Sequence, residues 1–313
     1  MKEKINRLRN KDLISIQDLT VKEIELILDT AKAFKEISDR AIKKVPVLRG
    51  KTIVNLYYEP STRTRISFEL AAKRLSADLV NVTAKTSSAV KGESLKDTIK
   101  TLEAMQASMV IIRHSEPGVP TLISQWVDFS IINAGDGSHA HPTQALIDMF
   151  TVREKRPVFK DLKIVIVGDI LHSRVARSNI QGFTKLGAKV VLCGPPTLIP
   201  KYVEQLGVLV TYDLEEAIES ADVVMLLRVQ FERQKANYFP SIREYSKYFG
   251  LDIDRLNNHR DILIMHPGPV NRDVEVKSEV AESSSSLINE QVTNGIAIRM
   301  AVLYLLAQRS KKV

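Results

Sequence analysis

Short runs rich in β-branched residues alternate with helix-like patterns along most of the chain, and this alternation restricts the possible folds more than any other feature. In the first half it predicts four strands, each followed by a helix. These strands and helices are expected in turn at residues 52–58, 62–75, 78–84, 93–106, 108–114, 119–126, 128–134 and 142–155. Because strands separated by helices pair in parallel through right-handed crossovers, the pattern predicts an α/β fold with a parallel sheet.

A charged segment at residues 153–162 interrupts the alternation, which then restarts. The second series of expected strands and helices comprises residues 163–169, 173–186, 189–195, 214–220, 222–229 and 261–269. Since 313 residues exceed the usual size of one hydrophobic core, we expect two domains, each a parallel sheet flanked by helices and joined by interdomain helices. We place them at 1–150 and 151–289, with an apolar helix at 290–313 that packs back on the first domain.

Two further segments have recognisable patterns. Thr20 and Glu23 form a capping box before an amphipathic pattern, which predicts a packing helix near the amino terminus. Residues 230–256 are polar and aromatic without a strand pattern, so a long loop is expected there. A loop of that length is either a functional lid or a surface excursion, and the extent of its movement on ligand binding is not readable from the sequence.

Composition excludes several classes of protein. No apolar run approaches the roughly 18 residues that a membrane span needs, and the amino terminus has no secretory signal pattern, so we expect a water-soluble protein. The single cysteine, Cys193, lies in an apolar run and is expected to be a buried residue of a cytoplasmic protein. The net charge of +8 is spread among acidic residues without a basic run, which argues against nucleic-acid binding.

The stretch "STRTR" at residues 61–65 stands at the junction of an expected strand and the helix that follows it. Unpaired backbone N–H groups at a helix amino terminus favour an anion, and Arg63 can add a planar guanidinium that matches phosphate oxygens. Taken alone, the stretch has a second interpretation, in which Ser61 or Thr62 only caps the helix and Arg63 and Arg65 are solvated.

Other polar clusters follow the expected strands of the first domain. Arg113 ends one strand, His141 and Gln144 follow the next, and Ser87 and Lys91 lie on a loop before a helix. The carboxyl ends of parallel strands meet at one edge of a sheet, where open α/β folds bind their ligands. The clusters therefore predict an anion site at that edge.

The second domain repeats this arrangement. Gly168 is the only glycine in the turn after its first strand, so the glycine-rich pattern of dinucleotide binding is absent and a nicotinamide cofactor is disfavoured. Arg174 opens the next helix, and Arg228 ends a later strand. Both suit substrate carboxylates, although a surface helix or an ion pair would explain each one alone.

Metal and covalent catalysis find little support. The six histidines show no zinc-ligand spacing, and neither a nucleophile elbow nor a Walker A pattern occurs. A site of arginines, hydroxyls, one lysine and one histidine binds anions and stabilises negative charge without attacking the substrate itself.

Six motifs in order, "STRTR", "KGES", "HPTQ", "GDILHSR", "RVQFER" and "HPGP", resemble the aspartate/ornithine carbamoyltransferase superfamily over most of the chain. The first and third are shared across the superfamily, whereas "RVQFER" and "HPGP" are similar to its aspartate-type members. The resemblance implies transfer of the carbamoyl group from carbamoyl phosphate to the amino group of L-aspartate, giving N-carbamoyl-L-aspartate and phosphate in pyrimidine synthesis. It implies no cofactor and no metal.

The resemblance also assigns the site. The residues implied to bind carbamoyl phosphate are Ser61, Thr62, Arg63, Thr64, Arg113, His141, Gln144, Gly268 and Pro269, the last two through their backbone. Within this set, the implied catalytic residues are Arg63, Thr64, Arg113 and His141, with Arg63 stabilising the departing phosphate. The residues implied to bind the aspartate carboxylates are Lys91, Arg174, Arg228 and Gln230.

The superfamily resemblance further implies a homotrimer with active sites shared between subunits, in which the neighbouring subunit supplies Ser87 and Lys91. Val90 departs from the superfamily pattern, which often has a lysine there, so only Lys91 carries the assignment. Whether regulatory or dihydroorotase-type chains bind is not readable from the sequence.

Other functions stay open at this point. An ornithine or another carbamoyltransferase shares part of the motif set, and an anion-binding scaffold of the same fold would bind phosphate without turnover. A dehydrogenase is weakened by the missing glycines.

Overall fold

The computed structural model describes residues 5–83, 93–229, 241–257 and 261–308. The chain divides into two compact units, the first formed by Met1–Ile147 with Thr293–Val313 and the second by Asp148–Val292. The division falls within α5 (Pro142–Lys155) and within α11 (Ile288–Ala307), so each of these helices contributes to both units. The α/β class and the two parallel sheets predicted from the sequence are confirmed.

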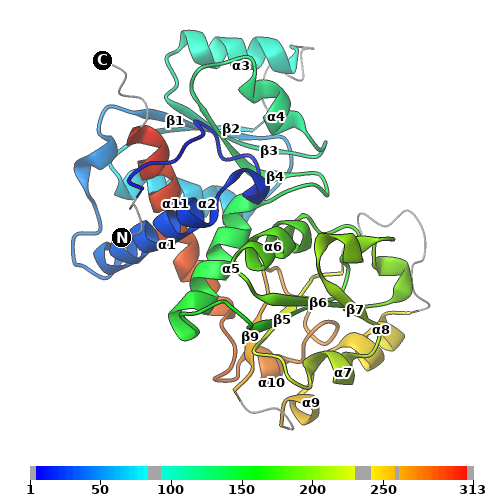
Figure 1. The fold of residues 1–313 in the computed structure, drawn as a ribbon. Helices are drawn as coiled ribbons and strands as arrows, with labels where there is room; N and C mark the ends of the chain where they lie inside the picture. The colour runs from blue at the N-terminus through cyan, green and yellow to red at the C-terminus, as the bar shows by residue number, and fades with distance from the viewer. Residues whose placement is uncertain (1–4, 84–92, 230–240, 258–260, 309–313) are drawn as a thin grey trace. The chain divides into compact units, whose positions relative to one another are not determined.

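The first unit is built on a four-stranded parallel sheet with strand order β2-β1-β3-β4 (Figure 1). Its strands are β1 (Thr52–Tyr57), β2 (Asp78–Thr83), β3 (Met109–His114) and β4 (Ser130–Asp136). Its other helices are α1 (Val21–Ser38), α2 (Thr62–Arg74), α3 (Leu95–Ala104) and α4 (Val119–Ser124), with the 3₁₀ turns η1 (Ile16–Asp18) and η2 (Pro46–Leu48). The predicted helix near the amino terminus is α1, and its capping box between Thr20 and Glu23 is present.

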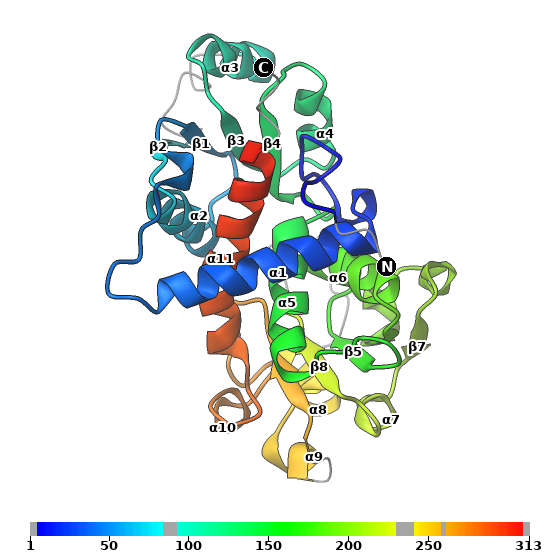
Figure 2. The same cartoon turned by 60° about the vertical axis from the view of Figure 1, so that its left-hand side comes forward.

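Helices cover both faces of this sheet (Figures 1 and 2). On one face, Ile99 of α3 and Ile123 of α4 pack against alternate strand residues such as Val54. On the other face α2 and α11 meet, and the guanidinium of Arg299 lies 4.9 Å from the centroid of the Phe68 ring. Helix α1 crosses α11, where the rings of Phe34 and Tyr304 meet edge on with centroids 5.5 Å apart.

A segment before α1 closes the outer edge of β4. The backbone N–H of Leu13 donates to Ile131 O at 2.9 Å, and Asn133 N–H donates to Leu13 O at 2.9 Å. This single residue pairs in parallel with the edge strand and satisfies backbone groups that an open edge would expose.

The second unit is built on a five-stranded parallel sheet with strand order β7-β6-β5-β8-β9. Its strands are β5 (Lys163–Val167), β6 (Lys189–Cys193), β7 (Leu209–Thr211), β8 (Val223–Leu226) and β9 (Leu263–Met265). Its helices are α6 (Arg174–Lys185), α7 (Leu214–Ile218), α8 (Ile242–Phe249), α9 (Ile253–Asn257) and α10 (Ser278–Ala281), with η5 (Pro196–Leu198) and η6 (Val203–Leu206). Helix α6 covers one face, and α7, α8 and α10 cover the other (Figure 1).

Cys193 at the end of β6 is fully buried, as its apolar neighbours predict. Burial raises the pKa of its thiol to about 12, helped by the negative charges of Asp213 and Glu216. The thiol is therefore protonated at neutral pH and acts as a small apolar residue of the core.

The loop prediction for residues 230–256 is wrong in its second part, because the described residues there form α8 and α9. Ser241 caps α8 by accepting a hydrogen bond from Glu244 N–H at 3.1 Å, so a capping signal was present in the sequence. Strand β7 and helix α10 were also missed, since β7 has three residues and α10 has four. Residues 230–240 lie outside the described part of the chain.

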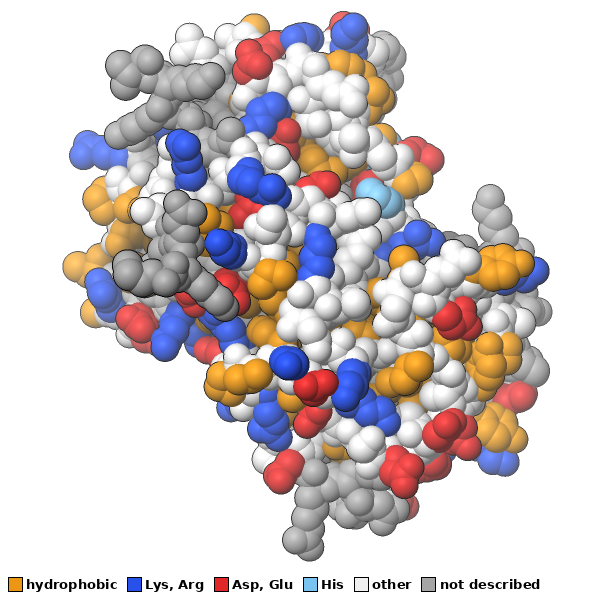
Figure 3. Space-filling view, in the orientation of Figure 1, with side chains coloured by type: hydrophobic (Ala, Val, Ile, Leu, Met, Phe, Trp, Pro, Cys, Tyr) orange, Lys and Arg blue, Asp and Glu red, His pale blue; other side chains and the backbone are white. Residues whose placement is uncertain are grey.

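On the face shown in Figure 3, lysine and arginine side chains are interspersed with acidic ones rather than gathered in one area. Among the helices that the structure describes, none has the length and apolar character that a membrane span requires.

Candidate active site

The carboxyl ends of three neighbouring strands gather most of the predicted residues of the first unit. Tyr57, the last residue of β1, lies opposite Arg113 on β3, and Tyr58 N–H donates to Arg113 O at 2.9 Å. The next neighbour is β4, which leads to His141 at the start of α5. Because the strands are parallel, the start of α2, Arg113 and His141 stand at the same edge of the sheet.

The start of α2 is open to an anion. Ser61 occupies the N-cap position, but its side chain makes no capping hydrogen bond in the described structure, and no acidic residue stands in the first turn. Thr62 and Arg63 are exposed, whereas Thr64 is buried. The interpretation of Ser61 as a simple cap is therefore not supported, and the positive end of the α2 helix dipole stands at this edge of the sheet.

A pocket lies beside this helix start. It is lined by Tyr57, Tyr58, Glu59, Pro60, Ser61, Thr62 and Arg65. Two of the predicted residues, Ser61 and Thr62, line the pocket, whereas Arg63 and Thr64 do not. Desolvation lowers the pKa of Arg63, but an arginine still keeps its positive charge at neutral pH. The helix start therefore carries a permanent positive charge.

Arg113 is held in one orientation at the end of β3, where it is largely buried. Its Nη1 donates to Ala134 O at 3.2 Å, and its Nη2 donates to Glu59 Oε1 at 3.1 Å. The guanidinium thus connects β4 with the turn between β1 and α2. A cation fixed in this way stabilises negative charge with little reorganisation.

His141 is buried at the start of α5, and its Nδ1 lies 3.5 Å from Thr143 Oγ1. The backbone carbonyl of His141 accepts a hydrogen bond from Gln144 N–H at 3.0 Å, which places Gln144 in the first turn of the helix. Both predicted residues therefore stand on a rigid helix start rather than on a loop.

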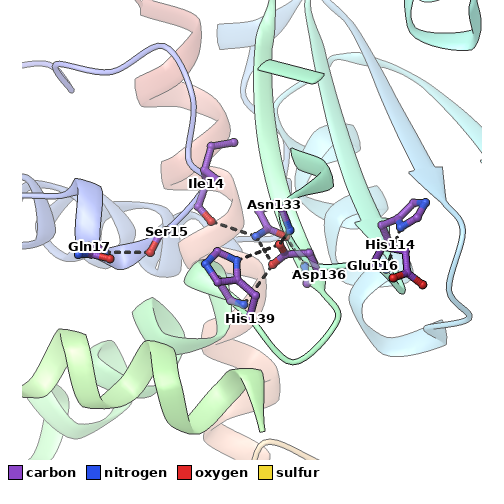
Figure 4. A network of polar contacts seen from close by, with 11 residues as sticks. Ile14, Ser15, Gln17, His114, Glu116, Asn133, Asp136 and His139 are labelled. Carbon is purple, nitrogen blue, oxygen red and sulfur yellow. Dashed lines mark hydrogen bonds and ion pairs between the residues drawn. The ribbon is translucent and has the colours of Figure 1, made fainter. Parts of the chain in front are cut away.

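Asp136, which the sequence prediction missed, fixes the turn that precedes His141 (Figure 4). Its buried carboxylate accepts hydrogen bonds from Asn133 Nδ2 at 2.8 Å, Ala140 N–H at 3.1 Å and His139 Nδ1 at 2.9 Å. It also accepts one from Gly118 N–H at 2.8 Å. The polar run "NAGDGSH", which spans the end of β4 and the turn after it, was the signal that could have identified it.

His114, at the end of β3, has a structural role. Its Nδ1 accepts a hydrogen bond from Glu116 N–H at 2.9 Å (Figure 4). Burial lowers the pKa of His114, although nearby acidic groups oppose the shift. The ring is therefore neutral at pH 7 and stabilises the turn that follows the strand.

The second unit gathers its predicted residues at the carboxyl edge of its own sheet, where β5, β8 and β9 are neighbours. Arg174 is buried at the start of α6, Arg228 is half-buried after β8, and Gly268 follows β9. Ser173 caps α6 by accepting a hydrogen bond from Ala176 N–H at 3.1 Å. The start of α6 is therefore capped by a side chain of the chain itself, unlike the start of α2.

Gly168 shows why the turn after β5 has a glycine. Its φ is +125°, and a Cβ there would lie 2.8 Å from Tyr245 Oη and 3.1 Å from Leu227 O. The glycine allows α8 and the exit of β8 to pack closely on this turn. The residue thus has a packing role.

Three predicted residues, Ser87, Lys91 and Gln230, lie outside the described residues. Among the residues that the structure does describe, no three His, Cys, Asp or Glu side chains are arranged to hold a metal ion.

The fold and the two sheet edges define a class of protein: an α/β protein of two units, of which the first has an open, arginine-bearing helix start and the second two arginines at the equivalent edge. Models of a known family match both halves. Residues 11–154 match the carbamoyl-P binding domain of aspartate/ornithine carbamoyltransferase, and residues 160–306 match its Asp/Orn binding domain. The chain belongs to the aspartate/ornithine carbamoyltransferase family.

Individual relatives agree with this assignment. The aspartate carbamoyltransferase catalytic subunit of Halothermothrix orenii is 55% identical over 303 residues, which cover 96% of this chain and 97% of the relative. The catalytic subunit of M. jannaschii aspartate transcarbamoylase superposes with a TM-score of 0.85 at 33% identity, covering 97% of this chain and 100% of that chain. The Trypanosoma cruzi aspartate transcarbamoylase, solved with carbamoyl phosphate and aspartate, superposes with a TM-score of 0.86 at 27% identity, covering 95% and 97%.

Proposed function

We propose that this chain transfers the carbamoyl group of carbamoyl phosphate to the α-amino group of L-aspartate, as part of pyrimidine synthesis in the cytoplasm. The observation that carries the proposal is the open start of α2 at the same sheet edge as Arg113 and His141. An uncapped helix start with a cation suits a phosphate, and fixed donors beside it suit a carbonyl oxygen that gains charge.

The roles proposed for the residues are those that the superfamily resemblance implies. Ser61, Thr62 and Arg63 hold the phosphate, while Thr64, Arg113 and His141 polarise the carbamoyl carbonyl. Gln144 with the backbone of Gly268 and Pro269 orients the carbamoyl nitrogen. Arg174 and Arg228 of the second unit receive the aspartate carboxylates, together with Gln230 and with Lys91 of a neighbouring subunit.

The reaction needs positioning and charge stabilisation only. The amine nitrogen of aspartate forms a bond to the carbamoyl carbon, the bond from that carbon to the phosphate oxygen breaks, and the amine proton passes to the departing phosphate. Arg63 stabilises the negative charge that collects on the phosphate. The unit formed around sheet β2-β1-β3-β4 is the carbamoyl phosphate-binding domain in this proposal, and the second unit is the aspartate-binding domain.

An assay of the purified protein with carbamoyl phosphate and either L-aspartate or L-ornithine tests the proposal. We expect N-carbamoyl-L-aspartate and inorganic phosphate in equal amounts, and no product with ornithine. Turnover with ornithine alone would replace the proposal by the ornithine activity. Phosphate binding without turnover on either amine would instead indicate an anion-binding scaffold.

We further propose a homotrimer whose sites combine Arg63 of one subunit with Ser87 and Lys91 of its neighbour, as the superfamily resemblance implies. Mixing inactive Arg63→Ala and Lys91→Ala subunits then restores activity, because about a quarter of the sites in random trimers join two intact residues. Mass spectrometry of intact trimers provides the control for mixing. Mixed trimers without recovered activity would contradict the shared site.

A further inference from the structure

Glu275 holds a buried carboxylate in the loop that follows β9. The side chain is 1% exposed, and it accepts three hydrogen bonds. Its Oε1 accepts from Val229 N–H at 2.8 Å and from Asn271 Nδ2 at 2.7 Å, and its Oε2 accepts from Asn271 N–H at 2.9 Å. A carboxylate buried so completely is costly unless its oxygens are paired, so the three donors define its place.

These bonds join the segments that leave two neighbouring strands. Strands β8 and β9 pair in parallel, and Val229 lies three residues beyond Leu226, the last residue of β8. Val229 directly follows Arg228, and Asn271 belongs to the loop that contains Gly268. The carboxylate therefore fixes the backbone next to Arg228 against the loop that leaves β9.

Glu275 itself cannot follow a displaced partner, because its own backbone is fixed. Its carbonyl accepts a hydrogen bond from Leu251 N–H at 3.0 Å, and Lys277 N–H donates to Leu251 O at 2.9 Å. The next residue, Val276, is buried in the core of the second unit. A change in the carboxylate therefore acts on the exit of β8 rather than on the backbone of Glu275.

The turn at Gly268 has a separate anchor. Gly268 N–H donates to His266 Nδ1 at 2.8 Å, and His266 N–H donates to Gln291 Oε1 at 2.9 Å. Gln291 Nε2 in turn donates to Asp148 Oδ1 at 2.8 Å. None of these three bonds involves Glu275 or Asn271, so loss of the Glu275 contacts should leave this turn in place.

We propose that Glu275 is a positioning residue for aspartate: by fixing Val229 it sets the direction from which the Arg228 guanidinium meets a substrate carboxylate. The inference rests on the proposed function, in which Arg228 binds aspartate. A planar guanidinium forms two parallel bonds to a carboxylate, so a small rotation of its backbone weakens both at once.

Glu275→Gln is the test, because the side chain keeps its size and one acceptor oxygen while an NH₂ group now faces an N–H donor. The expected result is a rise of about five- to tenfold in KM for L-aspartate, from one lost bond and one donor facing a donor. The KM for carbamoyl phosphate and kcat should change by less than about twofold, since their residues have other anchors.

Asp222→Asn is the matched control. Asp222 Oδ2 accepts a hydrogen bond from Lys163 N–H at 2.8 Å at the opposite, amino-terminal edge of the same sheet. This variant also loses a carboxylate that holds a backbone N–H, so it should lower the temperature of thermal unfolding while both KM values stay unchanged. Asn271→Ala provides a milder change near Glu275, and it should raise KM for L-aspartate about two- to threefold through one lost donor.

The outcomes separate cleanly. A folded Glu275→Gln variant with the wild-type KM for L-aspartate, or with both KM values raised alike, overturns the inference while the proposed function stands. If the glutamine variant does not fold, an unchanged KM for L-aspartate in Asn271→Ala overturns it. Wild-type protein that does not carbamoylate L-aspartate removes the proposed function and this inference together, and that result needs no variant.

Discussion

Helices α2 and α6 begin at the same topological position in the two units, but their N-terminal residues make different contacts. Helices α2 and α6 each follow the first strand of their sheet, each has a serine at the N-cap, and each has an arginine in its first turn. Ser61 makes no capping bond and Arg63 is exposed, whereas Ser173 caps its helix and Arg174 is buried. The same topology thus presents backbone donors in one unit and side-chain charge in the other.

The difference has an energetic side. A serine cap stabilises a helix by about 1 kcal/mol, so the first unit forgoes this contribution at α2. A helix start without a side-chain cap at a sheet edge is suited to a ligand that brings acceptor oxygens and negative charge. The capped start of α6 has less need of such a ligand, which fits the proposed binding of aspartate by arginines.

The largest effect is expected from substitution of Arg63, and it should differ in kind from the effect of substituting Arg174. Arg63→Ala should lower kcat by about a thousandfold, because charge stabilisation on the departing phosphate is lost. Arg174→Ala should act chiefly on KM for L-aspartate, because it removes a carboxylate contact. Steady-state kinetics over both substrates separates the two. An Arg63→Ala enzyme with normal turnover would break the comparison.

Substitution of the two N-cap serines should have smaller effects, on stability in one helix and on substrate binding in the other. Ser173→Ala should lower the free energy of unfolding by about 1 kcal/mol, because it removes the cap of α6. Ser61→Ala should leave the unfolding free energy within experimental error and raise KM for carbamoyl phosphate instead. Urea unfolding and kinetics on both variants are the measurements, and equal losses of stability would show that both serines act as caps.

The smallest effect concerns two buried glutamates, one in each unit. Burial opposes ionisation of Glu23, but N–H bonds from Arg9 and Thr20 outweigh it and lower its pKa below 4.5. Burial raises the pKa of Glu275, and its N–H donors offset this only in part. The stabilisation from Glu23 is therefore lost as the pH falls, whereas that from Glu275 is lost as the pH rises.

Glu23 stabilises the fold fully above pH 4.5, and its contribution is lost as the pH falls through its lower folded pKa. Glu275, whose folded pKa is raised, favours the fold at low pH and loses this contribution as the pH rises through that value. The free energy of unfolding falls when the pH is lowered from 6 into the acidic range, and this fall should be smaller in Glu23→Gln than in the wild type. The difference should be less than the loss expected for Ser173→Ala. An unchanged acid profile in urea unfolding would contradict the assignment.

The sequence predicted the alternation of both sheets because each strand except the three-residue β7 is long enough, and rich enough in β-branched residues, to be recognised. It also predicted the open edge of the first sheet from Arg63, Arg113 and His141, since topology alone brings strand ends together. It could not distinguish Ser61 from Ser173, because their hydroxyls differ only in the hydrogen bonds that they make. Asp136 and Glu275 were missed for the same reason, because most of their hydrogen bonds are made to turn residues whose conformation the sequence pattern does not show. The assignments of Ser87, Lys91 and Gln230 stay predictions.

The position of the unit boundaries affects how this chain emerges from the ribosome. The second unit is one continuous stretch, Asp148–Val292, whereas the first needs Thr293–Val313 from the far end of the chain. Domains fold as units during synthesis. The second unit can therefore be complete while the first still lacks α11, and contacts such as Arg299 with Phe68 can form only after the residues of α11 have been synthesised. The unit that is made first is in this sense the last to be completed.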